Sequence, residues 1–152
     1  MKLKLIILTL SVVLAIAANS QVTLGIGMGA SARGKFVAGF NAGYSSKIIN
    51  VSGALQTHTS NQVSTGAAIQ IRIGHEFKIN EDYSIEPYSG YVYNLHTIDV
   101  KGANSQRILL GLQVSKYLVF RGDDVKLYLS GTHTWDHTFI TFGIQGLFGG
   151  NR

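Results

Sequence analysis

From Val22 onward the chain alternates between apolar side chains and small or polar ones with a period of two. Such alternation is typical of β-strands, because successive side chains of a strand point to opposite faces of the sheet. No helical period and no apolar run of about 18 residues follows the first twenty residues, so we expect no transmembrane helix. The alternating stripes predict eight strands, at residues 22–28, 36–44, 49–55, 67–79, 83–95, 108–118, 125–131 and 140–148.

The predicted strands are long, and their connections alternate in length. Most strands reach about nine to eleven residues, the length with which a tilted strand crosses a bilayer, whereas about five or six is usual in soluble domains. Short turns at one rim and longer loops at the other are typical of outer-membrane β-barrels, and an even strand number places both termini at the short-turn rim. The short connections are 45–48, 80–82 and 119–124, and the others are 31–35, 58–65, 96–106 and 133–138.

The composition of the two stripes indicates which face meets which surroundings. One stripe consists of Ile, Leu, Val and Phe, and the other is rich in Gly, Ser, Thr, Gln and Asn. A soluble lipocalin-like calyx turns its apolar stripe inward and carries more Lys and Glu outside, whereas only 14% of the residues in the whole sequence are charged. We therefore expect the apolar stripe to face lipid and the small polar side chains to fill a narrow barrel. A secreted calyx that carries an apolar ligand is an alternative.

Residues 1–20 have the features of a secretory signal peptide. Lys2 and Lys4 precede an apolar run, and small residues follow it. The run is shorter than the roughly 20 apolar residues of a spanning helix. We expect cleavage after Ala17 or Ser20, which leaves residues 21–152 as one barrel domain.

Charge and cysteine content narrow the function classes further. The net charge of +5 includes the two lysines of the predicted signal peptide, and the remaining basic residues are scattered, so we expect no nucleic-acid partner. The chain has no Cys, which excludes disulfides, thiolate metal sites and cysteine catalysis.

Aromatic residues gather near both ends of the predicted strands. Two girdles of aromatic rings are expected where a barrel meets the lipid headgroups, although ordinary packing at hairpin ends also explains the pattern. Toward the short turns lie Tyr44, Phe77, Tyr83, Phe120 and Phe148, and toward the longer loops lie Phe36, Tyr93, Trp135 and Phe139.

By this pattern the chain resembles the small eight-stranded outer-membrane barrels, the family that includes OmpX and the transmembrane domain of OmpA. The resemblance implies an all-β, eight-stranded antiparallel up-and-down transmembrane β-barrel in the outer membrane of a Gram-negative cell. It also implies a monomer without cofactors, in contact with the lipid bilayer, lipopolysaccharide and the outer-membrane assembly machinery. The Asn19-Ser20-Gln21 junction suggests a Bacteroidota type.

The last predicted strand partly matches the assembly signal with which members of this family tend to end. Thr141, Gly143 and Phe148 fit that signal, whereas Gly146 stands where a second aromatic residue is expected. A short tail follows Phe148.

Five charged residues fall on the polar stripe, where an unpaired charge would cost several kcal/mol. We expect them to form a polar network in the lumen. Lys78 would pair with Glu86 if the two face each other across the 80–82 turn. Arg72 lies about 13 Å along the strand from Glu76 and needs a partner on a neighbouring strand. We favour a static network over a gated pore, because eight-stranded barrels are normally filled. The predicted network is Arg72, Glu76, Lys78, Glu86 and Lys126.

Other motifs in the chain carry little chemistry. Residues 29–35 fit G-x-x-x-x-G-K, but Phe36 stands where a phosphate-binding loop needs Ser or Thr, and residues 25–30 mimic a dinucleotide fingerprint without a βαβ unit. Histidines and carboxylates of the longer loops match no metal motif, so we expect no metal site. These loop residues are His58, His96, Asp99, His133, Asp136 and His137.

We expect no catalytic residue. His133 or His137 with Asp136 would supply the base and acid of a lipid-A-modifying acyl hydrolase or acyltransferase, but the nearby hydroxyls belong to threonines, with Ser130 deeper on the polar stripe. That enzyme is the alternative to a structural or surface-interaction role in adhesion, defence or membrane integrity.

Overall fold

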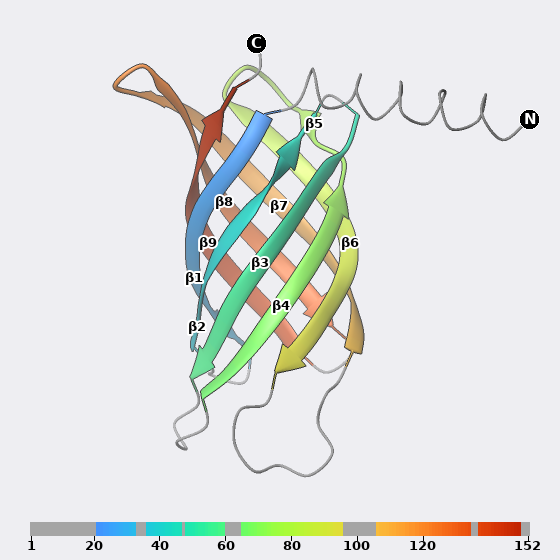
Figure 1. Ribbon diagram of the computed structural model, residues 1–152. Coiled ribbons are helices and arrows are strands. Elements are labelled where there is room, and N and C mark those ends of the chain that lie inside the picture. Colours follow the sequence, from blue (N-terminus) through green and yellow to red (C-terminus); the bar gives the residue numbers. More distant parts are fainter. Residues whose placement is uncertain are drawn as a thin grey trace, which may run out of the picture.

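The strands of the computed structural model form one closed antiparallel barrel (Figure 1). The structure describes residues 21–32, 36–46, 48–59, 65–95, 106–134 and 137–149, so the predicted signal peptide and Trp135 lie outside the described residues. No helix that could cross a membrane occurs within these ranges. The strands are β1 (Gln21–Ser31), β2 (Phe36–Ser45), β3 (Asn50–Thr59), β4 (Thr65–Gly74), β5 (Phe77–Lys78), β6 (Tyr83–Leu95), β7 (Gln106–Phe120), β8 (Asp123–Thr134) and β9 (His137–Phe148).

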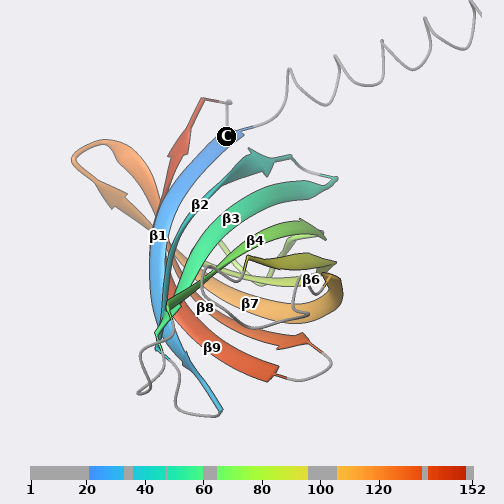
Figure 2. The same cartoon turned by 60° about the horizontal axis from the view of Figure 1, so that its bottom comes forward.

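Sequence neighbours pair along the sheet, and two further pairings close it. β1 pairs with β9, and β4 pairs with β6, so the strands enclose one interior, which Figure 2 shows from its end. Closure leaves the wall without a free sheet edge, so its backbone groups can pair without water.

β4 and β5 are two parts of one barrel strand. Both pair with β6 in a single register, Gly74 with Tyr88 and Phe77 with Ile85. Between these pairs lies Pro87, the only proline of the sequence, which has no N–H to donate to the ladder. The amide of His75 still donates to the Pro87 carbonyl at 3.3 Å. The predicted eight-stranded antiparallel barrel is therefore confirmed.

The two rims of the barrel differ. The β2–β3, β5–β6 and β7–β8 connections lie at the rim where Val22 pairs with Phe148, which we call the terminal rim. The opposite end is the loop rim, and most of its connections lie outside the described residues. The predicted placement of both barrel ends at the short-turn rim agrees with this arrangement.

Side chains alternate between the outside and the interior of the wall. Ile71 is 57% exposed and its neighbour Arg72 is 8% exposed, and the same alternation runs along the other strands. Among the described residues, sixteen buried residues are polar or charged and eight are hydrophobic, which reverses the distribution of a soluble domain. The predicted outward apolar stripe is confirmed, and the calyx alternative, which needs that stripe inside, is contradicted.

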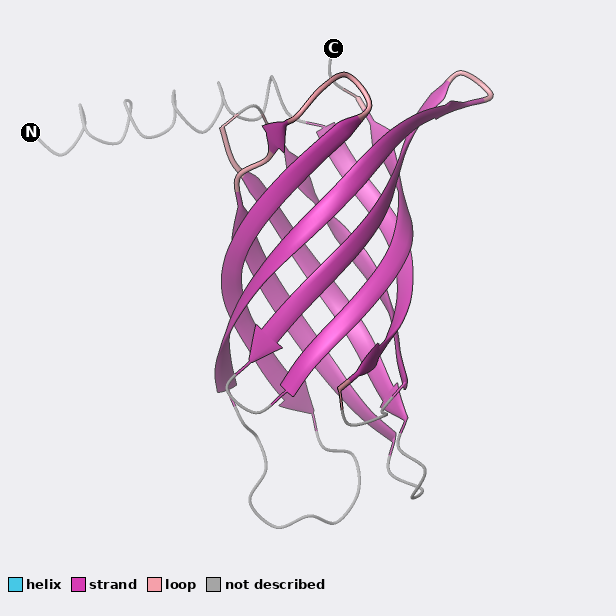
Figure 3. Cartoon of the chain, turned by 180° about the vertical axis from the view of Figure 1, so that it is seen from behind, coloured by secondary structure: helices cyan, strands magenta, loops and turns pink. Residues whose placement is uncertain are grey.

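The hairpin of β7 and β8 is longer than the sequence predicted. The expected 119–124 connection is a turn of two residues, Arg121 and Gly122, with φ of 53° and 89°. Two positive φ values are those of a type I′ hairpin turn, and glycine adopts one of them without steric cost. The hairpin consequently extends past its neighbours and bends away from the barrel (Figures 1 and 3).

The interior is not polar along its whole length. Ala68, Tyr88, Val92 and Leu109 form a buried apolar cluster, which we call the loop-rim cluster. Ala68 and Leu109 lie near the beginning of β4 and β7, and Val92 lies near the end of β6, so three of the four positions are next to the loop rim. An interior of polar side chains alone was therefore an incomplete prediction.

Candidate functional site in the barrel interior

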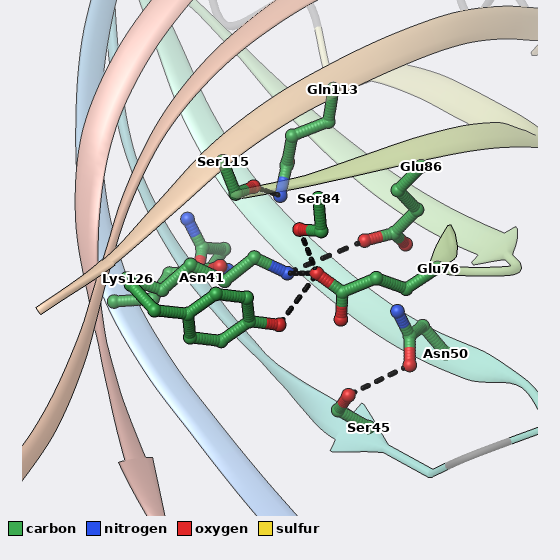
Figure 4. Close-up of polar contacts among 11 residues, drawn as sticks. Asn41, Ser45, Asn50, Glu76, Ser84, Glu86, Gln113, Ser115 and Lys126 are labelled. Carbon is green, nitrogen blue, oxygen red and sulfur yellow. Dashed lines mark hydrogen bonds and ion pairs between the residues drawn. The ribbon is translucent and has the colours of Figure 1, made fainter. Parts of the chain in front are cut away.

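Lys126 on β8 is the centre of the charged residues in the interior. Its Nζ lies 2.8 Å from Glu76 Oε1 and 3.7 Å from Glu86 Oε2, and its residue is 4% exposed (Figure 4). Glu86 comes from β6, and Glu76 comes from the link between β4 and β5. Both carboxylates point into the barrel from their strands and meet Lys126, which is distant from them in sequence, in one ion-pair cluster.

Glu76 also accepts two hydrogen bonds from neutral side chains. The hydroxyl of Ser84 donates to Oε1, and Tyr117 Oη donates to the same oxygen at 2.6 Å. The positive charge of Lys126 and the two hydroxyl donors stabilise the ionised form of this carboxylate in the interior. Glu76 Oε1 therefore has one charged partner and two neutral donors.

Arg72 has an aromatic partner in place of a carboxylate. Its guanidinium carbon lies 5.2 Å from the centre of the Tyr88 ring, on the neighbouring strand β6. This is a cation–π arrangement, whose strength grows when the cation is desolvated. The Arg72 Nε is buried without a hydrogen bond. The ring is itself held by the Tyr88 hydroxyl, which is hydrogen-bonded to Ser130 at 2.6 Å and Thr132 at 2.5 Å.

Lys78 does not join the interior cluster. It is exposed at the terminal rim, where its Nζ lies 5.6 Å from the centre of the Tyr117 ring. In the sheet register Lys78 pairs with Ser84, and the carboxylate of Glu86 turns to Lys126. The conditional pairing of Lys78 with Glu86 is therefore wrong, because the strand carries Lys78 past the rim while Glu86 lies inside.

Amide side chains form a second polar layer that the sequence did not single out. Asn41 Nδ2 donates to Tyr128 Oη at 3.0 Å, and Gln145 Nε2 donates to Asn41 Oδ1 at 2.8 Å. Gln70 Nε2 donates to Gln56 Oε1 at 2.6 Å. These residues are uncharged, so only their phase on the polar stripe pointed to the interior.

The space left inside is the size of water molecules. One cavity inside the barrel, of about 30 Å³, has room for about two water molecules. Arg72, Glu86, Tyr88, Gln113 and Lys126 are among the residues that line it. Side chains therefore fill most of the interior between the described strands.

The predicted aromatic residues do not all lie on the outer face. Phe139 is 9% exposed and pairs in register with the buried residues Ser31 and Thr132. Its place in a girdle is therefore wrong, because it has the inward phase of β9, one residue before the outward Ile140. Tyr93 is half-buried and Trp135 lies outside the described residues. The exposed ones are Phe36, Tyr44, Phe77, Tyr83, Phe120 and Phe148.

The residues of the enzyme alternative are only partly described. Ser130 is fully buried and hydrogen-bonded to Tyr88, so it is closed to a lipid substrate. His133 is exposed, with Nδ1 2.9 Å from Thr138 Oγ1. His96, Asp99 and Asp136, and the side chains of His58 and His137, lie outside the described residues. Within the described ranges, no three histidines and carboxylates lie together as metal ligands.

Comparison with known proteins supports the fold. No protein-family model and no curated protein matches the sequence. A designed transmembrane β-barrel is similar in structure, with a TM-score of 0.64, 13% identity and coverage of 84% of this chain and 94% of that one.

Natural outer-membrane proteins are similar as well. The N-terminal β-barrel domain of Pseudomonas aeruginosa OprF has a TM-score of 0.61 and 13% identity over 86% of this chain and 98% of that one. Ail, the attachment invasion locus protein of Yersinia pestis, has a TM-score of 0.51 and 15% identity over 84% of this chain and 96% of that one. The resemblance to small eight-stranded outer-membrane barrels is confirmed for the fold, and the Bacteroidota type stays a prediction.

Proposed function

We propose that this protein is a monomeric outer-membrane β-barrel with a structural or surface-interaction role, exported by a signal peptide at residues 1–20. The observation that carries the proposal is the reversed distribution of side chains. The wall exposes large apolar residues such as Ile26, Ile71 and Leu112, while polar and charged residues are buried. Lipid is the surroundings in which such a surface is stable.

The interior supports a role that needs no open pore. A water-sized cavity and the loop-rim cluster leave little space for a solute. Function would then come from the outer surface and the longer loops, through lipopolysaccharide, host or environmental contacts. The name of Ail as an attachment invasion locus protein fits this class of role, and at 15% identity it identifies no particular partner.

The test is membrane assembly of the full chain with one charge on the wall. Ile71→Asp places a carboxylate on the outer face of β4. Ile79→Asp makes the same chemical change in the exposed β5–β6 turn and is the matched control. We expect the wild type and Ile79→Asp to fractionate with the outer membrane and to change gel mobility on boiling, and Ile71→Asp to lose both properties. Normal assembly of Ile71→Asp, or a wild type soluble in plain buffer, would refute the proposal.

A further inference from the structure

The hairpin of β7 and β8 continues past the residues at which the neighbouring strands β6 and β9 stop pairing with it. β6 pairs with β7 only as far as Lys116, opposite Tyr83, and β9 pairs with β8 only from Asp124. Leu118, Val119 and Phe120 of β7 therefore pair only across the hairpin, with Val125, Asp124 and Asp123 of β8, and we call residues 118–123 the arm. Figures 1 and 3 show the arm bending outward from the terminal rim.

The arm exposes apolar side chains. Val119 is 66% exposed, Phe120 is 64% exposed and Leu118 is 38% exposed. An isolated two-stranded hairpin is marginally stable in water, and exposing three apolar residues makes it less favourable. A surface that covers these side chains would stabilise the arm.

One face of the arm continues the outer face of the barrel. Leu118 and Phe120 have the same phase on β7 as Leu112 and Val114, which are exposed on the wall. Val119 has the opposite phase. The arm bends outward from the barrel (Figure 1). Continued alternation along β7 would place Leu118 and Phe120 on the side of the surrounding lipid and Val119 on the opposite side.

Charged groups on the arm and at its base fit a headgroup layer. The Arg121 guanidinium carbon lies 5.6 Å from the centre of the Phe120 ring, and Lys116 Nζ lies 5.5 Å from the centre of the Tyr83 ring. Cations beside aromatic rings are typical of membrane interfaces. Asp123 and Asp124 on β8 balance these two positive charges. The balance favours zwitterionic lipid and gives no reason to expect anionic lipid to be preferred.

We propose that the arm lies on the membrane surface at the terminal rim, with Leu118 and Phe120 at the boundary of headgroups and acyl chains of zwitterionic phospholipid. The inference rests on the proposed insertion of the barrel into a bilayer. It makes the β7–β8 hairpin an interfacial anchor on one side of the barrel, in place of a simple turn.

The experiment measures lipid contact by quenching of single tryptophans. In a Trp135→Phe background, tryptophan replaces Phe120, Val119 or Leu112 in the full chain, reconstituted in phosphatidylcholine vesicles with and without bromine near the glycerol end of the acyl chains. Leu112→Trp reports barrel insertion, and Val119→Trp is the matched control on the opposite face of the arm. We expect brominated lipid to reduce the fluorescence of Phe120→Trp and Leu112→Trp and to leave that of Val119→Trp unchanged.

The outcomes separate the two proposals. Quenching of Leu112→Trp with none at Phe120→Trp overturns the arm inference and leaves the barrel intact. No quenching at Leu112→Trp refutes membrane insertion itself. Leu118→Trp is a second reporter on the same face if Phe120→Trp does not refold, as judged by its gel mobility on boiling. The lipid assignment would also be overturned if the fluorescence of Phe120→Trp did not respond to brominated lipid and changed only when a soluble envelope protein was added.

Discussion

Lys126 on β8 and Glu76 beyond the end of β4 meet at 2.8 Å inside the barrel, although fifty residues separate them in sequence. Neither strand neighbours the other in the sheet, because β6 and β7 lie between them. The ion pair therefore connects two walls across the interior. Both charged groups are buried, so the attraction between them offsets the loss of their hydration. Either charge alone would have lost its water without gaining a partner.

Removing the lysine should destabilise the barrel strongly. Lys126→Met leaves the carboxylates of Glu76 and Glu86 without their cation, and we expect a loss of about 3–5 kcal/mol in the free energy of unfolding. The Lys126→Met/Glu76→Gln double variant removes one uncompensated charge and should recover part of the loss. Urea unfolding in detergent micelles, followed by gel mobility, measures both. Strictly additive effects would show that the two residues are not coupled.

Acid should weaken the same contact. Protonation of Glu76 removes the negative charge that lies 2.8 Å from Lys126 Nζ. Lys126 would then lose its nearest buried counter-charge, so the stability of the barrel should fall as the carboxylate is protonated. Unfolding midpoints between neutral and acidic pH should show a smaller decline for Glu76→Gln than for the wild type. Equal declines would contradict this assignment.

The barrel itself was predictable because one physical rule governs the whole wall. Alternation with a period of two assigned nearly every side chain to one face of the sheet. Because lipid requires an apolar outer face, the composition of each stripe showed which face was outside. The rule fails at strand ends, where phase and depth both matter. It marks Lys78 as inward, yet the strand has already passed the rim there. For Phe139 the alternation was right, because the predicted stripe from Ile140 leaves it on the inward face, and the girdle assignment by position near the strand end was the error.

The partners inside the barrel were less predictable than the faces. Which carboxylate meets Lys126 depends on the register between strands and on the tilt of the strands in the barrel. Neither quantity can be predicted from the local sequence. Arg72 shows the same limit, because its partner is an aromatic ring, which charge pairing does not anticipate. The type I′ turn at Arg121 and Gly122 was missed because arginine is an unusual residue for a positive φ.

Two glycines should respond differently to a single methyl group. A Cβ at Gly111 would lie 2.2 Å from Cζ of Tyr88, whereas a Cβ at Gly131 would meet nothing within 4 Å. Gly111→Ala must displace the ring that contacts Arg72, and we expect it to cost about 1–3 kcal/mol of unfolding free energy. Gly131→Ala is the matched control and should change stability by no more than about 0.5 kcal/mol. Equal urea midpoints for the two variants would refute the role of the ring in packing.

The loop-rim cluster should control the passage of ions. Leu109 is fully buried against Ala68, Tyr88 and Val92, and apolar constrictions of this kind exclude water from a narrow lumen. Leu109→Ala opens space at this point, so we expect a higher conductance in planar bilayers than for the wild type.

Leu110→Ala is the matched control, because Leu110 is the next residue on β7 and is 58% exposed on the outer face. It should leave the conductance at the wild-type level. Loss of packing at Leu109 costs about 2–5 kcal/mol, so gel mobility on boiling must first show that the variant is folded. A folded Leu109→Ala barrel that conducts no better than Leu110→Ala would place the barrier to ions in the polar layers around Lys126 instead.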